Sequence, residues 1–368
     1  MKNGLFVTRE DLYAKDAHSN GVIKKIFNQI STLNIEGQLF CKPFILPKTI
    51  CNPIFLFFSY LLFDIYRKIS FDICYFDFIY IRRLFPINYS FIKLLKLIKK
   101  KNVKCKIIYE IPTYPYDQEH KTISSKVVLF IDKIFRVKLK KYIDRIVTVS
   151  NDDIIFGIPT IKIRNGIRCG DIQIRTPEIS DENLHLILVA QFSTWHGYDR
   201  IIRGLNDFYK EKEIAKKVYA HFVGNGPEMD HYNILVKQYN LSGYVIFYGP
   251  LFGEKLTEVF KKTDIAVCSL GCHRKGIYLT SELKSREYLA RGMPMVSSTK
   301  IDILPLDFKF CLYVPEDDSP VNIQLIIDYY QNLIKEQTVY EMVREIRTFA
   351  EENCDISKTM QPVIEYIL

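Results

Sequence analysis

The sequence lacks the features that mark a secreted or membrane-spanning protein. Its nine cysteines are an odd number, they show no paired Cys-x-x-Cys spacing, and no signal-peptide pattern opens the sequence. The apolar run at 55–63 has nine residues, whereas a membrane-spanning helix needs roughly 20. We therefore expect a cytoplasmic protein that does not cross a membrane.

Motifs for metals and dinucleotides are also missing. No Asp-x-Asp sequence occurs, so the usual reason to expect a catalytic divalent ion is absent. Cys268, Cys272 and His273 lie close in sequence, but a zinc site needs further ligands, and packing at a strand end is the simpler interpretation. Gly224 and Gly226 begin a G-x-G-x-x-G fingerprint that the sequence does not complete. We therefore expect neither a metal nor a cofactor.

The two halves of the chain carry net charges of opposite sign. Residues 1–170 hold 29 Lys and Arg against 14 Asp and Glu, a net charge of +15, whereas residues 171–368 hold 22 against 28, a net charge of −6. The first half therefore favours an anionic partner. Within it, residues 91–106 combine seven lysines with several Leu and Ile residues. This pattern predicts a basic amphipathic face on an anionic membrane surface, and an ordinary solvated surface is the alternative.

Strand and helix patterns alternate along the chain in two runs. A chain of 368 residues with 48% apolar residues can fill two hydrophobic cores. In the first run, strands are predicted at 5–8, 73–76, 106–109, 146–149 and 160–163, and helices at 21–33, 54–68, 90–101 and 123–142. In the second run, strands are predicted at 184–189, 218–223, 245–247, 265–268 and 295–297, with late helices at 320–335, 338–352 and 359–368.

This alternation predicts an α/β protein with two Rossmann-like, doubly wound parallel sheets. The polar segment at 168–183 is the predicted linker between them. We therefore expect domains over residues 1–170 and 171–355, followed by a C-terminal helix in 356–368.

Residues 281–298 carry the most specific functional signal. They predict a helix with its N-cap at Thr280 or Ser281. The free N–H groups of the first turn and the positive end of the helix dipole suit a phosphate, and Lys284 adds a full charge. Glu287 lies one turn further along the same face, where a carboxylate can accept two sugar hydroxyl groups. This combination predicts a site for a sugar nucleotide.

The same segment resembles the signature of retaining, family-four-like glycosyltransferases of the GT-B fold. The matching residues are Lys284, Glu287-Tyr288-Leu289-Ala290, Gly292-Met293-Pro294 and Val296-Ser297-Ser298. Other segments are similar to the family in order and spacing, strongly after residue 145 and weakly before residue 100. These segments are 109–117, 149–150, 165–167, 189–200, 223–228, 245–249 and 263–267.

The resemblance implies an enzyme that moves a sugar from a nucleotide-diphosphate sugar to a carbohydrate or lipid-linked glycan. It implies a retaining, hexosyltransferase-type reaction in surface polysaccharide biosynthesis, such as capsule or O-antigen. By the same resemblance, the domains face each other across a cleft, with 1–170 on the acceptor side and 171–355 binding the nucleotide sugar. The helix in 356–368 is then expected to return to the N-terminal domain. A lipid-linked acceptor would favour a peripheral location on the inner face of the cytoplasmic membrane.

The sequence also departs from the family pattern. Leu279 stands where the family commonly has the first glutamate of a pair, and Glu282 is three residues out of register. The usual Arg and Lys that hold the diphosphate fall at Gln191 and His196. Neutralisation of the diphosphate must therefore come from other cations. Candidates are Arg200, Lys284, Arg274 and Lys275.

The candidate site residues form three groups. Residues expected to take part in the reaction are Glu287, Lys284, His196 and Arg200. Residues expected to bind the donor are Gly224, Gly226, Gly249, Ser281, Leu283, Lys284 and Glu287. Residues expected to bind the acceptor are Gly21, Glu110, Tyr114 and Asp117.

Each group also has a purely structural interpretation. The glycines can simply permit tight turns, and His196 can contact the helix that follows it. Arg200 can pair with a neighbouring aspartate on its helix, and Glu287 can be a buried carboxylate satisfied by the backbone. Residues 110–117 can form a rigid proline-rich turn whose tyrosines only pack.

Two other functions remain open at the level of sequence. The absence of the first glutamate, at Leu279, and of the usual basic pair fits a catalytically idle GT-B subunit that binds glycan or membrane and scaffolds an assembly. Nucleic-acid binding fits the basic first half, but the chain contains no recognised nucleic-acid module. We therefore expect no nucleic-acid partner.

Overall fold

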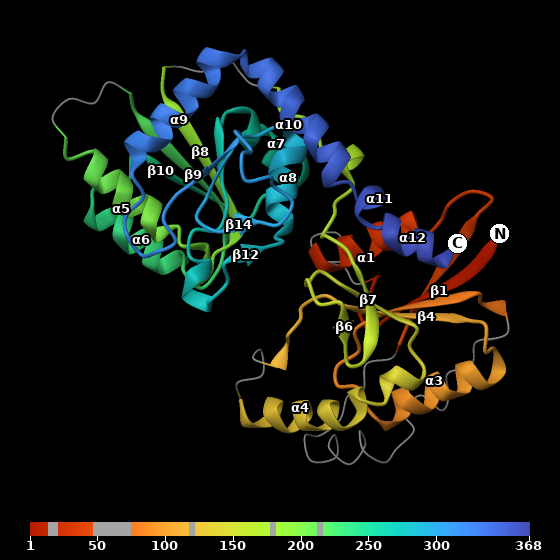
Figure 1. The fold of residues 1–368 in the computed structure, drawn as a ribbon. Helices are drawn as coiled ribbons and strands as arrows, with labels where there is room; N and C mark the ends of the chain where they lie inside the picture. The colour runs from red at the N-terminus through yellow and green to blue at the C-terminus, as the bar shows by residue number, and fades with distance from the viewer. Residues whose placement is uncertain (14–20, 47–74, 118–121, 177–181, 212–215) are drawn as a thin grey trace. The chain divides into compact units, whose positions relative to one another are not determined.

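The computed structural model divides the chain into two compact units. It describes residues 1–13, 21–46, 75–117, 122–176, 182–211 and 216–368. Unit 1 comprises Met1–Arg164 together with Thr359–Leu368, and unit 2 comprises Asn165–Lys358. The division therefore falls six residues before the expected boundary at 170, and the chain rejoins unit 1 at Thr359 instead of residue 356. Figure 1 shows the fold of both units.

Unit 1 is built on a seven-stranded sheet with the order β2-β1-β3-β4-β5-β7-β6. The strands are β1 (Lys2–Thr8), β2 (Leu39–Ile45), β3 (Phe78–Arg82), β4 (Lys106–Ile111), β5 (Arg145–Thr148), β6 (Ile154–Ile155) and β7 (Ile158–Lys162). All neighbours pair in parallel except β6 and β7, which are antiparallel. Parallel pairing needs crossover segments, and the described helices include α1 (Gly21–Thr32), α3 (Tyr89–Lys101) and α4 (Ile123–Arg136).

The two faces of this sheet bury different side chains. On one face, Ile79 and Ile107 belong to the same apolar cluster as Leu95 of α3 and Phe135 of α4. On the other face, the rings of Phe6 and Tyr80 stack with centroids 5.0 Å apart. Consecutive residues of β3 and β4 are buried, so packed side chains cover both faces of the sheet.

The C-terminal residues pack onto unit 1. α12 (Gln361–Ile367) ends beside the strand beginnings, where Lys2 Nζ donates to the Ile367 carbonyl at 2.7 Å and Lys106 Nζ donates to the Tyr366 carbonyl at 2.6 Å. In Figure 1 the blue C-terminal helix accordingly lies close to β1. Two cations thus satisfy carbonyls that the helix end leaves without partners.

Unit 2 is built on a six-stranded parallel sheet with the order β10-β9-β8-β11-β13-β15. These strands are β8 (Leu184–Gln191), β9 (Val218–Asn225), β10 (Val245–Gly249), β11 (Ile265–Val267), β13 (Met295–Ser297) and β15 (Cys311–Tyr313). A separate parallel pair consists of β12 (Leu279–Thr280) and β14 (Lys300–Ile301). The helices are α5 (Asp199–Phe208), α6 (Met229–Gln238), α7 (Gly253–Lys261), α8 (Leu283–Arg291), α9 (Ile323–Glu336), α10 (Val339–Asn353) and α11 (Ile356–Thr359). Both units are therefore α/β with parallel sheets, as the sequence predicts.

Several elements differ from the sequence prediction. The second strand of the first run was expected at 73–76, whereas the structure has β3 at Phe78–Arg82. Neither β2 nor β15 was predicted. Short apolar stretches are hard to assign by periodicity alone, and β15 has only three residues. The helix expected at 54–68 and the apolar run at 55–63 lie outside the described residues. Along the described ranges, none of the helices combines the length and apolarity needed to cross a bilayer.

The apolar side of α3 faces the protein core. Leu94, Leu95 and Ile98 are buried, so the expectation that the apolar residues of this segment lie on a membrane is wrong for these three. Lys99 Nζ donates to Asp144 Oδ2 at 2.7 Å, which uses one of the seven lysines in an ion pair. Other lysines of residues 91–106 are exposed at the surface, among them Lys96, Lys100, Lys101 and Lys104.

Arg347 on α10 fixes the segment before β8 to the rest of unit 2. Its Nη1 donates to the Ile172 carbonyl at 2.9 Å and to the Ala290 carbonyl at 2.6 Å, and its Nη2 donates to the Cys169 carbonyl at 2.8 Å. The described part of the expected linker at 168–183 is therefore packed structure in unit 2. A buried guanidinium suits this task because it presents five donors in a fixed fork.

Replacing Arg347 by Ala should destabilise unit 2. The change leaves three buried carbonyls without a charged donor, and each such loss costs about 1–3 kcal/mol. We expect the free energy of unfolding to fall by about 3 kcal/mol or more. Trp195 is the single tryptophan and lies in unit 2, so urea denaturation followed by its fluorescence reports on this unit.

The matched control for this variant is Glu351→Gln. Glu351 accepts from Nε of the same guanidinium at 2.6 Å, but its side chain is half exposed. Exposed ion pairs contribute about 1 kcal/mol or less, so this variant should unfold close to wild type. Equal losses in both variants would show that the carbonyl contacts of Arg347 are not what stabilises the segment.

Candidate active site

The strand order of unit 2 reverses between β8 and β11. β9 and β10 extend the sheet on one side of β8, whereas β11, β13 and β15 extend it on the other. In open parallel sheets, ligands bind beyond the carboxyl ends of the strands at this switch point. The segment after β8 forms η6 (Thr194–His196) and then α5, and the segment after β11 forms η7 (Cys272–Lys275), β12 and α8. The switch point therefore brings together the segments with the strongest sequence signals.

The loops after β8 and β11 touch through their backbones. The Leu270 N–H donates to the His196 carbonyl at 2.8 Å, and the Gly271 N–H donates to the Trp195 carbonyl at 3.2 Å. Gly197 has φ +62°, and a Cβ atom there would lie 2.6 Å from the Gly271 nitrogen. Only glycine at position 197 permits this approach, which holds the two loops in one arrangement.

Tyr198 connects the strand ends to α8. Its hydroxyl donates to the Val267 carbonyl of β11 at 3.2 Å and accepts from Lys284 Nζ at 3.1 Å. The lysine also lies 3.6 Å from the Glu282 carboxylate, which accepts from Ser269 Oγ at 2.8 Å. Lys284 is thus held at the switch point with its charge only partly neutralised.

His196 is a neutral donor at this site. Its Nδ1 accepts the Ser193 N–H at 3.0 Å, so the single ring proton resides on Nε2. Burial first, and then the nearby charges of Lys284 and Lys275, lower the pKa of His196 to about 3. The imidazole can therefore donate one hydrogen bond to an anion, but it carries no charge at neutral pH.

α8 itself begins slightly later than the sequence predicts. Its first residue is Leu283 and its N-cap is Glu282, instead of Thr280 or Ser281. Ser281 accepts from Arg286 Nη2 at 3.2 Å, and its carbonyl accepts from Asn165 Nδ2 at 2.8 Å. The Ser281 hydroxyl and carbonyl are therefore engaged in holding the helix start to the first residues of unit 2.

Glu287 lies one turn along α8 from Lys284. Its carboxylate accepts from Arg291 Nη2 at 3.3 Å, and about a third of the side chain (34%) is exposed. Arg291 is almost fully buried and stacks on the Phe260 ring with its Cζ 4.2 Å from the centroid. Glu287 is therefore not the buried, backbone-satisfied carboxylate of the structural interpretation. Part of its side chain remains available to a ligand.

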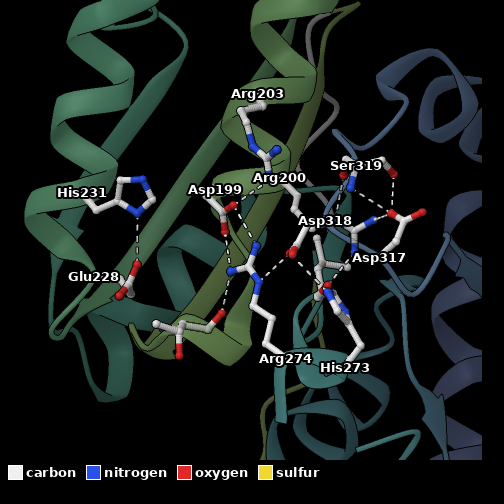
Figure 2. Close-up of polar contacts among 12 residues, drawn as sticks. Asp199, Arg200, Arg203, Glu228, His231, His273, Arg274, Asp317, Asp318 and Ser319 are labelled. Carbon is white, nitrogen blue, oxygen red and sulfur yellow. Dashed lines mark hydrogen bonds and ion pairs between the residues drawn. The ribbon is translucent and has the colours of Figure 1, made fainter. Parts of the chain in front are cut away.

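Arg200 does not fit the expected role in binding the diphosphate. It is fully buried, and its guanidinium donates to the carbonyls of Leu270 at 2.5 Å, Ser319 at 2.8 Å and Pro315 at 2.9 Å. Figure 2 shows this side chain directed toward Asp317 and Ser319. Because its donors are used by the protein backbone, Arg200 supports the loops and is omitted from the proposed anion-binding residues.

Arg274 is also engaged within the protein. It forms two hydrogen bonds of 2.9 Å with the Asp199 carboxylate and another of 2.7 Å with Asp318 (Figure 2). These contacts hold η7 against the start of α5. Lys275 instead lies over the Trp195 ring, 3.0 Å from its centroid. Arg274 thus connects η7 to the start of α5, a structural role that its neighbours in the sequence did not indicate.

The two glycines at the end of β9 have a structural reason to be glycine. A Cβ atom on Gly224, which has φ +136°, would lie 1.9 Å from the Ala190 oxygen, and one on Gly226 would lie 2.3 Å from the Phe192 oxygen. The close approach of β9 to the end of β8 therefore requires both residues. Gly249 differs, because it has φ +68° and open space at the Cβ position. A role for these three residues in donor binding stays a prediction.

In unit 1, Glu110 lies at the carboxyl end of β4 in a buried ion-pair cluster. Its Oε1 is 3.2 Å from Lys25 Nζ and 3.0 Å from Arg82 Nη1. Burial alone would raise the pKa of this carboxyl, but the two cations outweigh it and lower the pKa to about 2. Gly21 opens α1, the helix that carries Lys25, and a Cβ there would meet open space.

The remaining acceptor candidates contact other parts of unit 1. Asp117 accepts from Arg136 Nη1 at 2.7 Å and lies 3.1 Å from Lys133 Nζ. The ring of Tyr114 packs edge-on against Phe156 at 5.8 Å between centroids. These contacts fit the structural interpretation of 110–117 as a packed turn, and acceptor binding there stays a prediction.

The cysteines that lie close in sequence are packed side chains. Cys268 and Cys272 are buried, and burial raises the pKa of each thiol. His273 Nε2 contacts Asp318 at 3.2 Å. Among the residues that the structure describes, no group of three or more His, Cys, Asp or Glu side chains has a geometry suited to a metal ion.

Two residues of the candidate site, Tyr198 and Glu282, were not identified from the sequence. Tyr198 lies within the segment that resembles the glycosyltransferases, but nothing in a single tyrosine indicates that it joins β11 to Lys284. Glu282 was judged by its register with the family pattern, whereas its actual role is to bind Ser269 and approach Lys284. Each role involves a contact with a residue more than ten positions away in sequence, Val267 and Lys284 for Tyr198 and Ser269 for Glu282.

The sequence matches no protein-family model and no curated protein sequence. Solved structures, in contrast, match along the whole chain. A glycosyltransferase from Rickettsia africae ESF-5 has a TM-score of 0.61 at 13% identity, covering 100% of this chain and 97% of its own. HepE from Anabaena, solved in complex with UDP-glucose, has a TM-score of 0.57 at 12% identity, covering 100% and 99%. The lipopolysaccharide outer core galactosyltransferase WaaB has a TM-score of 0.56 at 14% identity, covering 100% of both chains. The chain therefore has the GT-B fold.

Proposed function

We propose that this protein is a glycosyltransferase that uses a nucleotide-diphosphate sugar. The observation that carries the proposal is the meeting of Lys284, the neutral His196 and the first turn of α8 at the switch point of unit 2. A partly neutralised lysine, a ring N–H donor and the N–H groups of a helix start all favour a bound anion. The structural neighbours support the donor class, since HepE was solved with UDP-glucose.

In the proposed reaction, the bond between the anomeric carbon and the diphosphate oxygen breaks, and the acceptor hydroxyl forms the new glycosidic bond. The acceptor proton passes to the leaving phosphate oxygen, so no protein nucleophile is required. Lys284 and the helix dipole stabilise the negative charge that builds on the diphosphate, and His196 donates its Nε2–H to it. Glu287 accepts the ribose hydroxyl groups and places the nucleotide. Retention of anomeric configuration and hexosyl transfer follow the family resemblance.

The acceptor is proposed to be a carbohydrate or a lipid-linked glycan of a surface polysaccharide. This class is supported by WaaB, which is described as a lipopolysaccharide outer core galactosyltransferase. We propose a cytoplasmic protein attracted to the anionic inner face of the membrane, because residues 1–170 carry a net charge of +15 and several lysines of α3 are exposed.

A panel of UDP-, GDP-, ADP- and dTDP-sugars tests the function directly. A ligand that binds only the folded protein raises its melting temperature, so thermal shift identifies the donor. Incubation with glycan acceptors then measures release of the nucleoside diphosphate. Binding with neither hydrolysis nor transfer would indicate an idle scaffold, and the absence of any shift would contradict a donor site.

Replacing Lys284 by Ala should weaken nucleoside diphosphate binding by about tenfold or more, because a charge-assisted hydrogen bond contributes about 1.5–3 kcal/mol. Binding of the uncharged nucleoside should change little. Quenching of Trp195 fluorescence can measure both affinities, and Lys237→Ala on the exposed side of α6 is the matched control. Equal losses for diphosphate and nucleoside would identify Lys284 as a structural residue.

Replacing Glu287 by Gln should lower the rate of transfer by about two orders of magnitude, the effect of losing one or two charged hydrogen bonds. Unfolding should stay near wild type, since about a third of the Glu287 side chain is exposed and the amide oxygen of glutamine can still accept from Arg291. Steady-state kinetics gives the first quantity and urea denaturation the second. Glu258→Gln, which removes the exposed partner of Lys261 on α7, is the control. Wild-type turnover in Glu287→Gln would remove Glu287 from the site.

His196 should stay neutral between pH 5 and pH 8. Its pKa in the folded protein is about 3, below the ordinary value of 6.5, so folding stability is lost as pH falls from 6.5 toward 3. The His196→Asn variant should lose less stability over this range, because asparagine cannot be protonated. Histidine NMR resonances and urea denaturation at several pH values measure both effects. A His196 resonance that titrates near pH 6.5 would refute the assigned charge state.

A further inference from the structure

α4 of unit 1 presents a row of exposed apolar side chains. The exposed fractions are 85% for Ile123, 42% for Val127, 60% for Phe130, 39% for Ile134 and 55% for Val137, the residue after the helix. Their spacing of four, three, four and three residues places them along one face of the helix. A continuous exposed apolar face of this kind is a mark of an interaction surface.

The opposite face of α4 is already fixed in the core. Leu129, Ile131 and Phe135 are buried in the apolar cluster of unit 1. Asp132 is also buried, and its carboxylate accepts the Ile87 N–H at 2.8 Å and the Tyr116 hydroxyl at 2.7 Å. The helix cannot rotate to bury the outer row without breaking these contacts. The apolar row therefore belongs to the surface of the folded unit.

Positive charge surrounds this row. Residues 122–141 contain six Lys and Arg against one Asp, a net charge of +5, and that aspartate is the buried Asp132. Lys126, Lys133 and Lys138 are exposed beside the apolar side chains, and of these Lys133 is also paired with Asp117. The surface that covers the row must therefore be anionic around an apolar interior.

The same charges argue against pairing of α4 with a second copy of itself. If the row occupies the a and d positions of a coiled coil, Lys126 and Lys133 fall at g and Lys138 falls at e. In a parallel pair, Lys133 of one copy would then meet Lys138 of the other across the seam, and two like charges there are destabilising. The row also spans only about two heptads, which is short for a stable coiled coil.

The basic surface continues onto α3. Figure 1 shows α3 and α4 on the same side of the unit 1 sheet, and both contribute to one apolar cluster. α3 adds exposed Lys96 and Lys100, together with Leu97, to that outer layer. Two helices thus share a basic outer layer, whereas the continuous apolar row lies on α4 alone.

We propose that α4 docks unit 1 onto an anionic lipid bilayer by inserting this apolar row at the interface. The apolar side chains enter the boundary between headgroups and acyl chains, and the flanking lysines contact lipid phosphates. The proposal extends the membrane attraction suggested by net charge to a defined element with an apolar contribution. It does not depend on the chemistry at unit 2.

Sedimentation of the full-length protein with vesicles tests this proposal. Wild type should bind vesicles of phosphatidylcholine with 30% phosphatidylglycerol and bind pure phosphatidylcholine at least tenfold more weakly. The double variant Val127→Ser with Phe130→Ser should bind the anionic vesicles at least tenfold more weakly than wild type. The variant Lys126→Gln with Lys138→Gln should also weaken binding and reduce its dependence on salt. Ile234→Ser with Leu325→Ser, which removes exposed apolar residues of unit 2, should bind as wild type.

Three outcomes would overturn the proposal. One is wild type that does not bind anionic vesicles, and another is equal binding by wild type and the Val127→Ser, Phe130→Ser variant. The third is evidence that protein already covers the row. This evidence would be a melting temperature several degrees lower in the Val127→Ser, Phe130→Ser variant, or a dimer of the wild type that these substitutions dissociate. Transfer to a soluble acceptor should be unchanged in the variant. If wild type binds vesicles but transfers no sugar, the enzymatic proposal fails while the docking surface stands.

Discussion

The reversal of strand order between β8 and β11 is the constraint on which the candidate site depends. Because of this reversal, the loops after β8 and β11 lie side by side at the end of the sheet. Gly197 lets their backbones approach within hydrogen-bonding distance. Tyr198 then joins β11 to Lys284 through one hydroxyl group. Because these contacts are made within unit 2 itself, the lysine is placed before any ligand arrives. Preorganised charge of this kind stabilises a developing anion at little reorganisation cost.

The cations of unit 2 divide into two classes with different physical roles. Arg200 and Arg347 are buried, and their guanidinium groups satisfy backbone carbonyls that would otherwise be orphaned. Lys284 has fewer protein partners and lies at the end of the sheet where a ligand is expected. A planar group with five donors suits a carbonyl cluster, whereas a compact ammonium suits an incoming phosphate. Net charge alone cannot separate these roles.

The surface of unit 1 follows a similar division. The lysines of α3 form a dense run in the sequence, yet three of the apolar residues between them, Leu94, Leu95 and Ile98, face the core. α4 carries fewer lysines but presents its apolar row outward. Helical periodicity identifies two faces on α4, and only the packing of Leu129, Asp132 and Phe135 shows which of them is inside. A membrane-docking surface needs both charge and exposed apolar area, and these coincide on α4.

The sequence by itself determined the α/β class, the repeated parallel sheets and the position of α8 as the centre of the candidate site. These features depend on local periodicity, on the glycine stop at position 292 and on neighbours within one helix turn, all of which a single sequence displays. Only the tertiary structure decided that Arg200 and Arg274 are supports, that His196 is neutral and that Glu110 is locked between Lys25 and Arg82. The physical reason is that burial, charge state and hydrogen-bond partners depend on residues far apart in the chain, which meet only when the sheets and loops have folded together.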